Sequence, residues 1–268
     1  MLRRPAPGLA LAALTVALGL GACAGEKPRA STAGTAPSTT TQAAPAGNLT
    51  VLAAASLTDA FTDLGRAFET IHAGTKVTFG FDASSTLATQ ANSGAPADLF
   101  ASADQPNMKK VTDTGTAAGP RVFARNKLAI LVQKGNPKQI TTLVDLEKPA
   151  VSFVLCAAEV PCGKYGAQAL SKAGVKAQPK SLEANVKAVV TKVTSGQVDA
   201  GIGYVTDAKA AAGMADGIDI PDQYNVAAEY PMAVLKQSKN PNLAYLFLDY
   251  VLGPDAQAML RKFGFSGP

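Results

Sequence analysis

Small hydroxyl residues stand at two points where an apolar, strand-like run passes into a helical pattern. Ser56 follows the run at 48–55, and Ser84 and Ser85 follow the run at 76–81. The start of a helix exposes unpaired N–H groups and the positive end of the helix dipole, which together attract an anion. A serine there can equally be a simple cap that accepts a backbone N–H. Capping and anion binding therefore both remain open for these residues.

Two further junctions between a strand and a helix present mainly backbone groups. Cys162 and Gly163 follow a strand-like run at 150–157, and Val186 follows Asn185 where an apolar helical pattern begins. Ligands of open α/β sheets lie at the carboxyl ends of the strands. The four junctions would form one anion site only if the fold brings them together, which the pattern alone does not show.

The elements that would position these residues alternate between strand and helix. Apolar runs predict strands at 48–56, 76–81, 97–103, 126–136, 150–157, 198–204 and 229–235. Helical spacing of apolar residues follows most of them, and the clearest case is the series Leu57, Ala60, Phe61, Leu64, Phe68 and Ile71. Ser56 and Asp59 resemble a capping box at its start. Such alternation predicts an α/β fold with mostly parallel sheets, and about 220 folded residues suit two small lobes.

The N-terminal 47 residues do not read as part of this fold. A basic start and a short apolar run predict a signal peptide at 1–22, and "LGAC" resembles a bacterial lipobox that would lipidate Cys23. An ordinary secretion signal with a chance cysteine is the alternative, and either one takes the protein out of the cytoplasm. Residues 23–47 contain no Val, Leu, Ile, Phe, Met or Tyr, which predicts a flexible tether.

Bulk composition and the remaining cysteines limit the classes of partner. The net charge of +5 is spread along 268 residues without a basic block, which argues against nucleic-acid binding. Cys156 and Cys162 of an exported protein are expected to form a disulfide worth about 2 kcal/mol. A metal pair is the alternative, but there is no second cysteine pair, and His72, the single histidine, lies far away in the sequence.

Seven segments in order resemble one family. They are "AAASLTDAF", "FDASSTLATQ", "SGAPADLFASAD", "EVPCGKYG", "NVKAVV", "GIGYVTDA" and "EYPMAVL", and together they resemble the periplasmic molybdate-binding proteins of ABC importers over residues 48–268. The resemblance implies the two-lobed periplasmic-binding-protein fold, with a hinge crossed twice near 125–128 and 229–232. Lobe one would comprise 48–125 with 230–268, and lobe two 126–229.

The resemblance also implies a ligand and its contacts. The side chains of Ser56, Ser84 and Tyr204 and the backbone N–H groups of Cys162 and Val186 would bind molybdate or tungstate. All of these are neutral donors, which suits a tetrahedral dianion without a proton. The proton of phosphate would face a donor and cost about 1–3 kcal/mol, and sulfate would be too small for the cavity.

The resemblance further implies a receptor that delivers the oxyanion to the membrane subunits of an ABC permease. With the lipobox at Cys23, we expect a monomer that is lipid-anchored at the extracytoplasmic face of the cell membrane. The resemblance implies no cofactor, no bound metal cation and no enzyme activity. The alternatives are a binding protein for another oxyanion such as sulfate, an exported serine hydrolase or an adhesion module. The hydrolase is disfavoured because the chain has no G-x-S-x-G motif and no histidine near a candidate serine.

The neighbours of these positions are expected to have ordinary roles. We expect Lys164 and Lys187 to be solvated, with a modest steering role as the alternative. We expect Tyr165 and Tyr230 to be packing residues. Asp82 and Asp104 have two possible places, a structural position and the rim of the cleft, and the sequence leaves both open.

Overall fold

The computed structural model describes residues 45–268. The predicted signal peptide at 1–22, the predicted lipidation site Cys23 and nearly all of the predicted tether lie outside the described residues. Among the described residues, the first regular element is β1, which begins at Gly47. Within residues 45–268, no helix combines the length and the apolar character that a membrane crossing requires.

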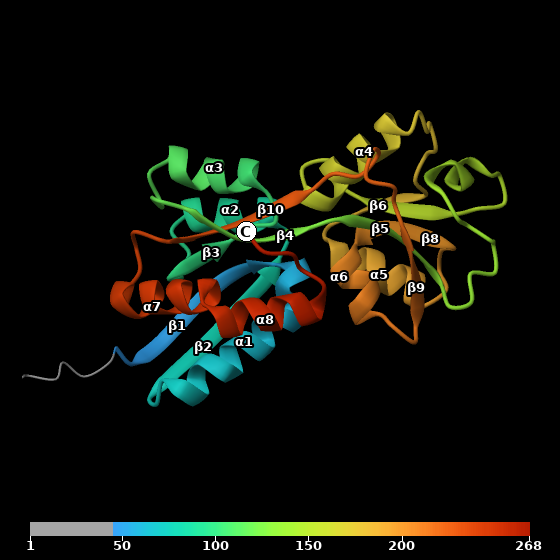
Figure 1. Ribbon diagram of the computed structural model, residues 1–268. Helices are drawn as coiled ribbons and strands as arrows, with labels where there is room; N and C mark the ends of the chain where they lie inside the picture. Colours follow the sequence, from blue (N-terminus) through green and yellow to red (C-terminus); the bar gives the residue numbers. More distant parts are fainter. Residues whose placement is uncertain (1–44) are drawn as a thin grey trace, which may run out of the picture. The chain divides into compact units, whose positions relative to one another are not determined.

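A five-stranded sheet forms the framework of the first lobe (Figure 1). Its strand order is β2 (Thr75–Asp82), β1 (Gly47–Ala54), β3 (Leu99–Ala101), β10 (Ala228–Val234) and β4 (Arg121–Asn126). Strand β10 runs antiparallel to both of its neighbours, and the other four strands run in one direction. The carboxyl ends of β1, β2 and β3 therefore meet at one edge, which is where a ligand of such a sheet is expected.

The second lobe repeats this plan with a second sheet. Its strand order is β7 (Ser181–Glu183), β6 (Phe153–Cys156), β8 (Ala200–Tyr204), β5 (Leu128–Gln133) and β9 (Ala215–Asp219). Here β5 is the single antiparallel strand, and it lies between β8 and β9. Two mixed sheets in which four of five strands share a direction agree with the predicted α/β fold and its mostly parallel sheets.

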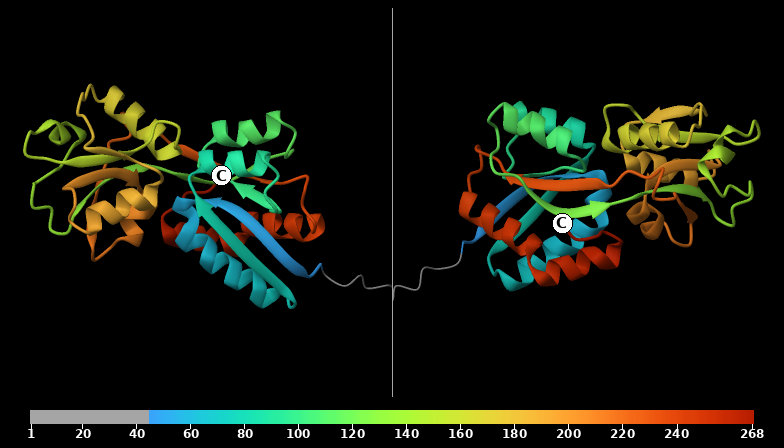
Figure 2. Two further views of the ribbon diagram at one scale, coloured as in Figure 1. Left: turned by 180° about the vertical axis from the view of Figure 1, so that it is seen from behind. Right: turned by 45° about the horizontal axis from the view of Figure 1, so that its top comes forward.

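Helices cover both faces of each sheet (Figures 1 and 2). In the first lobe one face carries α1 (Thr58–Ile71), α7 (Pro241–Leu252) and α8 (Pro254–Phe263), and the other carries α2 (Ser84–Asn92) and α3 (Gln105–Asp113). In the second lobe α4 (Pro161–Lys172) lies opposite α5 (Val186–Thr194) and α6 (Val205–Ala210). Two short 3-10 helices, η1 (Ala55–Leu57) and η2 (Leu143–Glu147), complete the elements of residues 45–268.

The predicted spacing of apolar residues in α1 is confirmed by its packing. Phe61 and Phe68 are fully buried and contact the ring of Phe247 on α7, with centroids 6.4 Å and 5.1 Å apart. Ile71, the last residue of the predicted apolar face, is instead 62% exposed because it lies at the helix end.

The close packing of α5 depends on two glycines in β8. A Cβ on Gly201 would lie 2.5 Å from Cγ1 of Val189 on α5, and one on Gly203 would lie 3.3 Å from Cγ2 of Val186 on α5 and 2.6 Å from a methyl carbon of Leu131 on β5. Side chains rarely or never approach so closely, so these glycines let α5 and β5 lie directly against β8. This places the start of α5 beside the end of β8.

The chain passes between the sheets twice, as the predicted hinge requires. It leaves the first sheet at the end of β4 and enters the second at Leu128, and it returns through residues 220–227 to β10. The side-chain amide of Asn225 joins the two crossings, because it accepts from the N–H of Leu128 at 3.0 Å and donates to its C=O at 2.9 Å.

Candidate functional site

A small cavity lies between the two lobes at the ends of β1, β2 and β8. The residues that line it are Ala54, Ala55, Ser56, Asp82, Ala83, Ser84, Ala103, Val160, Pro161, Cys162, Asn185, Val186 and Tyr204. All five residues that the sequence predicted as anion contacts are among them, although they come from five different elements. Its free volume is small, close to the space that one bound water needs.

Ser56 belongs to η1, the short turn between β1 and α1. The predicted capping box with Asp59 is wrong, because α1 begins only at Thr58 and no side chain caps it. The hydroxyl of Thr58 instead bonds to the C=O of Ala55 at 2.7 Å. The buried Oγ of Ser56 lies 2.9 Å from Oη of Tyr230.

Tyr230 therefore does more than pack, which corrects the expectation from the sequence. Oδ1 of Asn126 accepts from the N–H of Lys127 at 3.0 Å, so its Nδ2 is the donor that lies 3.4 Å from Oη of Tyr230. Tyr230 can then donate its one hydrogen to Ser56. This leaves the hydrogen of Ser56 free for an acceptor in the cavity.

The hydroxyl of Ser84, like that of Ser56, can donate its hydrogen into the cavity, although the group that it accepts from is different. It is the first residue of α2, which begins after Ala83 without a side-chain cap, so Ser84 is not the cap that the sequence allowed. Its buried Oγ accepts the N–H of Ala103 at 2.9 Å. A hydroxyl that already accepts one bond can turn its hydrogen toward the cavity.

The second lobe contributes the starts of α4 and α5. The N–H of Lys164 bonds to the C=O of Val160 at 3.0 Å, and Oδ1 of Asn185 accepts the N–H of Ala188 at 3.1 Å. The N–H groups of Cys162 and Val186 come before these bonds in their helices and have no intrahelical partner. Two helix N-termini therefore present backbone donors and partial positive charge at the cavity.

A disulfide anchors the start of α4. Cys156, at the end of β6, is bonded to Cys162, which confirms the predicted pair. The turn that it closes is tight, since a Cβ on Gly163 would lie 2.0 Å from the C=O oxygen of Ala157. Only glycine fits at that position, so the loop holds the N–H of Cys162 in one place.

Tyr204 is the most informative residue of the cavity. It ends β8 and is 1% exposed, yet its hydroxyl has no hydrogen-bond partner among residues 45–268. Burial raises the pKa of this phenol well above its ordinary value, so the hydroxyl keeps its proton. Buried polar groups nearly always have a partner. The unpartnered O–H of Tyr204 at the wall of the cavity is therefore available to donate to an acceptor placed there.

The charged groups next to the cavity do not offer a direct cation. No Lys, Arg or His is among its lining residues. Asp82 is the one charged residue in the lining, and its Oδ1 is engaged by the N–H of Ala83 at 2.7 Å and by Nδ2 of Asn185 at 3.1 Å. Across residues 45–268, no group of three His, Cys, Asp or Glu side chains is arranged to hold a metal cation.

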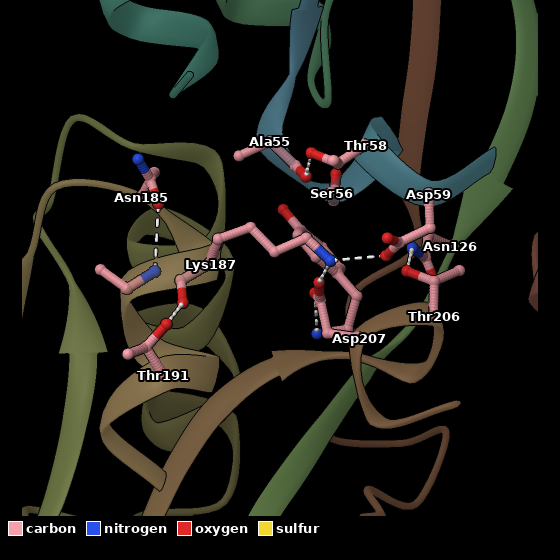
Figure 3. Close-up of polar contacts among 12 residues, drawn as sticks. Ala55, Ser56, Thr58, Asp59, Asn126, Asn185, Lys187, Thr191, Thr206 and Asp207 are labelled. Carbon is pink, nitrogen blue, oxygen red and sulfur yellow. Dashed lines mark hydrogen bonds and ion pairs between the residues drawn. The ribbon is translucent and has the colours of Figure 1, made fainter. Parts of the chain in front are cut away.

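Lys164 and Lys187 stand outside the cavity, but they are not simply solvated as expected. Each side chain is 32% exposed, and each is paired with a carboxylate of the first lobe. Lys187 lies 2.8 Å from Asp59, and Lys164 lies 3.4 Å from Asp104 (Figure 3 shows the Lys187 contacts). Asp104 is fully buried and caps α3 through the N–H of Asn107, so its role is structural.

The geometry gives no support to nucleophilic catalysis. His72 is the residue that follows α1, and its ring packs on Phe68 with centroids 4.3 Å apart. The partners of Ser56 and Ser84 are a phenol and a backbone N–H, and neither can act as a general base for serine.

Comparison with known proteins identifies relatives along almost the whole chain. Residues 49–266 match the family model described as a bacterial extracellular solute-binding protein. The molybdate-binding protein ModA of Mycobacterium tuberculosis is 39% identical over 251 residues, which cover 93% of this chain and 94% of that protein.

Two solved structures share the fold at 20% identity. The periplasmic molybdate-binding protein of Azotobacter vinelandii matches with a TM-score of 0.74 over 82% of this chain and 99% of that one. The sulfate-binding protein SubI of Mycobacterium tuberculosis matches with 0.75 over 82% and 86%. At such identity these two matches describe the fold and not the ligand. The family match over residues 49–266 and the 39% identical relative show that this chain belongs to the bacterial extracellular solute-binding proteins.

Proposed function

We propose that the cavity binds one molybdate or tungstate ion for delivery to an ABC permease. The observation that carries this proposal is the buried hydroxyl of Tyr204, which has no partner among the described residues and lies in a cavity without a lining cation. The relative from Mycobacterium tuberculosis, named as a molybdate-binding protein, supports the choice of ion.

The proposed contacts are all hydrogen donors. Ser56, Ser84 and Tyr204 would donate through their hydroxyls, and Cys162 and Val186 through their backbone N–H groups. A tetrahedral oxyanion without a proton offers only acceptors, so each donor finds a partner. The helix N-termini distribute positive charge around the dianion, and closure between the lobes keeps water from these bonds.

The same donor set selects against other oxyanions. Phosphate at neutral pH usually carries a proton, which would face a donor and leave a mismatch of about 1–3 kcal/mol. Sulfate has the right charge and no proton, so only its smaller size would weaken its bonds. Sulfate binding is therefore the alternative that an experiment has to separate. A serine hydrolase is not supported, because neither serine has a base beside it.

Several features of the receptor follow as parts of this proposal. The lobes would divide at 48–125 with 230–268 and at 126–229, and they would close on the ion by bending at the two crossings. Lipidation of Cys23 would hold a monomer at the extracytoplasmic face of the membrane. A Cys23→Ala variant should then leave the membrane fraction of cells, whereas an ordinary signal sequence would make that substitution silent.

Thermal unfolding of residues 45–268 with four oxyanions tests the ligand. Ligand at about one hundred times its dissociation constant stabilises a protein by about 2.7 kcal/mol. This corresponds to a rise of about 5–10 °C in Tm for a domain of this size. We expect that rise with molybdate and tungstate, and little with equal concentrations of sulfate or phosphate. A flat response to molybdate would exclude the proposal, and the largest response with sulfate would favour the alternative.

A further inference from the structure

Lys187 makes an ion pair across the cleft. It is the second residue of α5 in the second lobe, and its Nζ lies 2.8 Å from Oδ2 of Asp59 in the first turn of α1 in the first lobe. Figure 3 shows the side chain extended from α5 so that its ammonium group lies between Asp59 and Asp207. The preceding residue, Val186, lines the cavity.

Asp207 fixes the other side of this ammonium group. It lies in the second lobe, is 1% exposed, and its Oδ1 is 3.7 Å from Nζ of Lys187. Its Oδ2 accepts the N–H of Tyr204 at 3.1 Å. Burial raises the pKa of Asp207 to about 6, and Lys187 opposes that rise. Because Asp207 and Lys187 belong to the same lobe, their contact does not depend on how the lobes are arranged.

Two more polar contacts cross the cleft beside the cavity. Lys164 on α4 lies 3.4 Å from the buried carboxylate of Asp104, and Nδ2 of Asn185 donates to Oδ1 of Asp82 at 3.1 Å. In all three contacts the partner in the first lobe is a carboxylate and the partner in the second lobe is a nitrogen donor. We call these three contacts, Lys187–Asp59, Lys164–Asp104 and Asn185–Asp82, the rim contacts.

We propose that Lys187 is a positioning residue that retains the bound ion, because its pair with Asp59 forms only when the lobes are closed. The inference rests on the proposed function, since it concerns release of the same oxyanion. Lys187 and Asp59 touch each other and not the cavity, so they act through closure rather than through contact with the ion.

Opening the cleft would separate Lys187 from only one of its two carboxylate partners. Lys187 would keep Asp207 as its partner and would lose Asp59. The free energy of the Lys187–Asp59 pair is therefore available to oppose opening, and its loss should appear in the rate of release. Both side chains are partly exposed, at 32% and 48%, so the pair is also subject to screening by salt.

The test compares two aspartates of the same helix. Asp59→Asn removes the pair across the cleft, whereas Asp63→Asn removes an equally exposed carboxylate that pairs with Arg66 inside α1. Release of radiolabelled molybdate is followed after addition of excess unlabelled molybdate. We expect release to be about two- to fivefold faster in Asp59→Asn, the range of an exposed pair. Asp63→Asn should release at the wild-type rate.

Two further measurements distinguish this role from a purely structural one. They are the dependence of the release rate on salt and the effect of substituting Lys187. Wild-type release should accelerate with added salt, and the acceleration should be smaller in Asp59→Asn. In a Lys187→Met background, Asp59→Asn should have no further effect, and Lys187→Arg should restore slow release. Equal release rates and equal salt dependence in Asp59→Asn and the wild type would overturn the inference, even if Lys187→Met does not fold. Failure of the wild type to bind molybdate would overturn the proposed function instead.

Discussion

Substitution of Tyr230 by Phe tests how the donor set of the cavity is oriented. Tyr230 is fully buried and does not line the cavity, so the change removes one oxygen atom and no direct contact with the ion. That oxygen lies 2.9 Å from Oγ of Ser56 and 3.4 Å from Nδ2 of Asn126. Without it, the hydroxyl of Ser56 is no longer held with its hydrogen toward the cavity.

The expected loss follows from these contacts. Asn126 keeps a second acceptor, Oγ1 of Thr206 at 2.9 Å, so its amide is not left unpaired. The effect is then limited to one net hydrogen bond of about 1 kcal/mol and to the freedom that the Ser56 hydroxyl regains. Together they predict a molybdate affinity that is about 5–20-fold weaker. The preference over phosphate should also narrow, because Ser56 can then accept the proton of that ion.

Isothermal titration of the wild type and the variant measures both effects. Tyr250→Phe is the matched control, since this tyrosine packs on Phe68 in the first lobe and does not line the cavity. If Tyr230 acts through Ser56, the double variant Ser56→Ala with Tyr230→Phe should bind no more weakly than Ser56→Ala alone. Fully additive losses, or wild-type affinity in Tyr230→Phe, would refute this account of the hydrogen-bond direction.

Three further predictions concern single features of the site. Ser84→Ala removes a donor of the cavity and the acceptor of a buried N–H, so titration should show molybdate binding weakened by about 1–3 kcal/mol, whereas the neighbouring Ser85→Ala should not change it. Asp207 has a pKa of about 6, above its ordinary 3.8, so its stabilising contribution is present below about pH 4 and is lost as the pH rises through 6. The stability of Asp207→Asn relative to the wild type should therefore increase by about 3 kcal/mol from acid to neutral pH in urea unfolding, and an unchanged difference would contradict the shift. Replacing Cys156 and Cys162 by Ser should lower Tm by about 4–8 °C, given about 2 kcal/mol for a loop with a sequence separation of 6, and an equal Tm would show that the bond contributes nothing.

The resemblance of the sequence to a known family was sufficient to predict which residues gather at the cavity. Ser56, Ser84, Cys162, Val186 and Tyr204 all lie next to the end of a strand or the start of a helix, and such ends converge in an α/β fold. Their assignment as contacts came from the family resemblance, because the pattern alone left capping open. Their role as ligands stays a prediction.

The contacts that the sequence did not predict join residues that are far apart in the chain. The η1 turn moves Ser56 away from the start of α1. Its hydroxyl instead contacts that of Tyr230, which is 174 positions away in the sequence. Lys187 and Asp59 are separated by 128 positions, so no local pattern distinguished this lysine from a solvated one.

The strands β4, β7 and β9 were also not predicted. Each lies at the edge of its sheet, with a short, polar or glycine-containing sequence in place of an apolar run. Edge strands bury fewer side chains, so they carry a weaker hydrophobic pattern.

The site separates selection of the ion from retention of the ion. Selection depends on neutral donors whose hydrogens are directed by groups behind them, such as Tyr230 behind Ser56. Retention depends on the rim contacts, of which Lys187–Asp59 and Lys164–Asp104 pair opposite charges through lysines that do not line the cavity. The two kinds of substitution should then behave differently across ions. Asp59→Asn should accelerate release of molybdate, tungstate and sulfate by the same factor, because closure is common to all of them. Tyr230→Phe should change the ratio of affinities for molybdate and phosphate, because only the direction of a donor distinguishes an ion with a proton from one without.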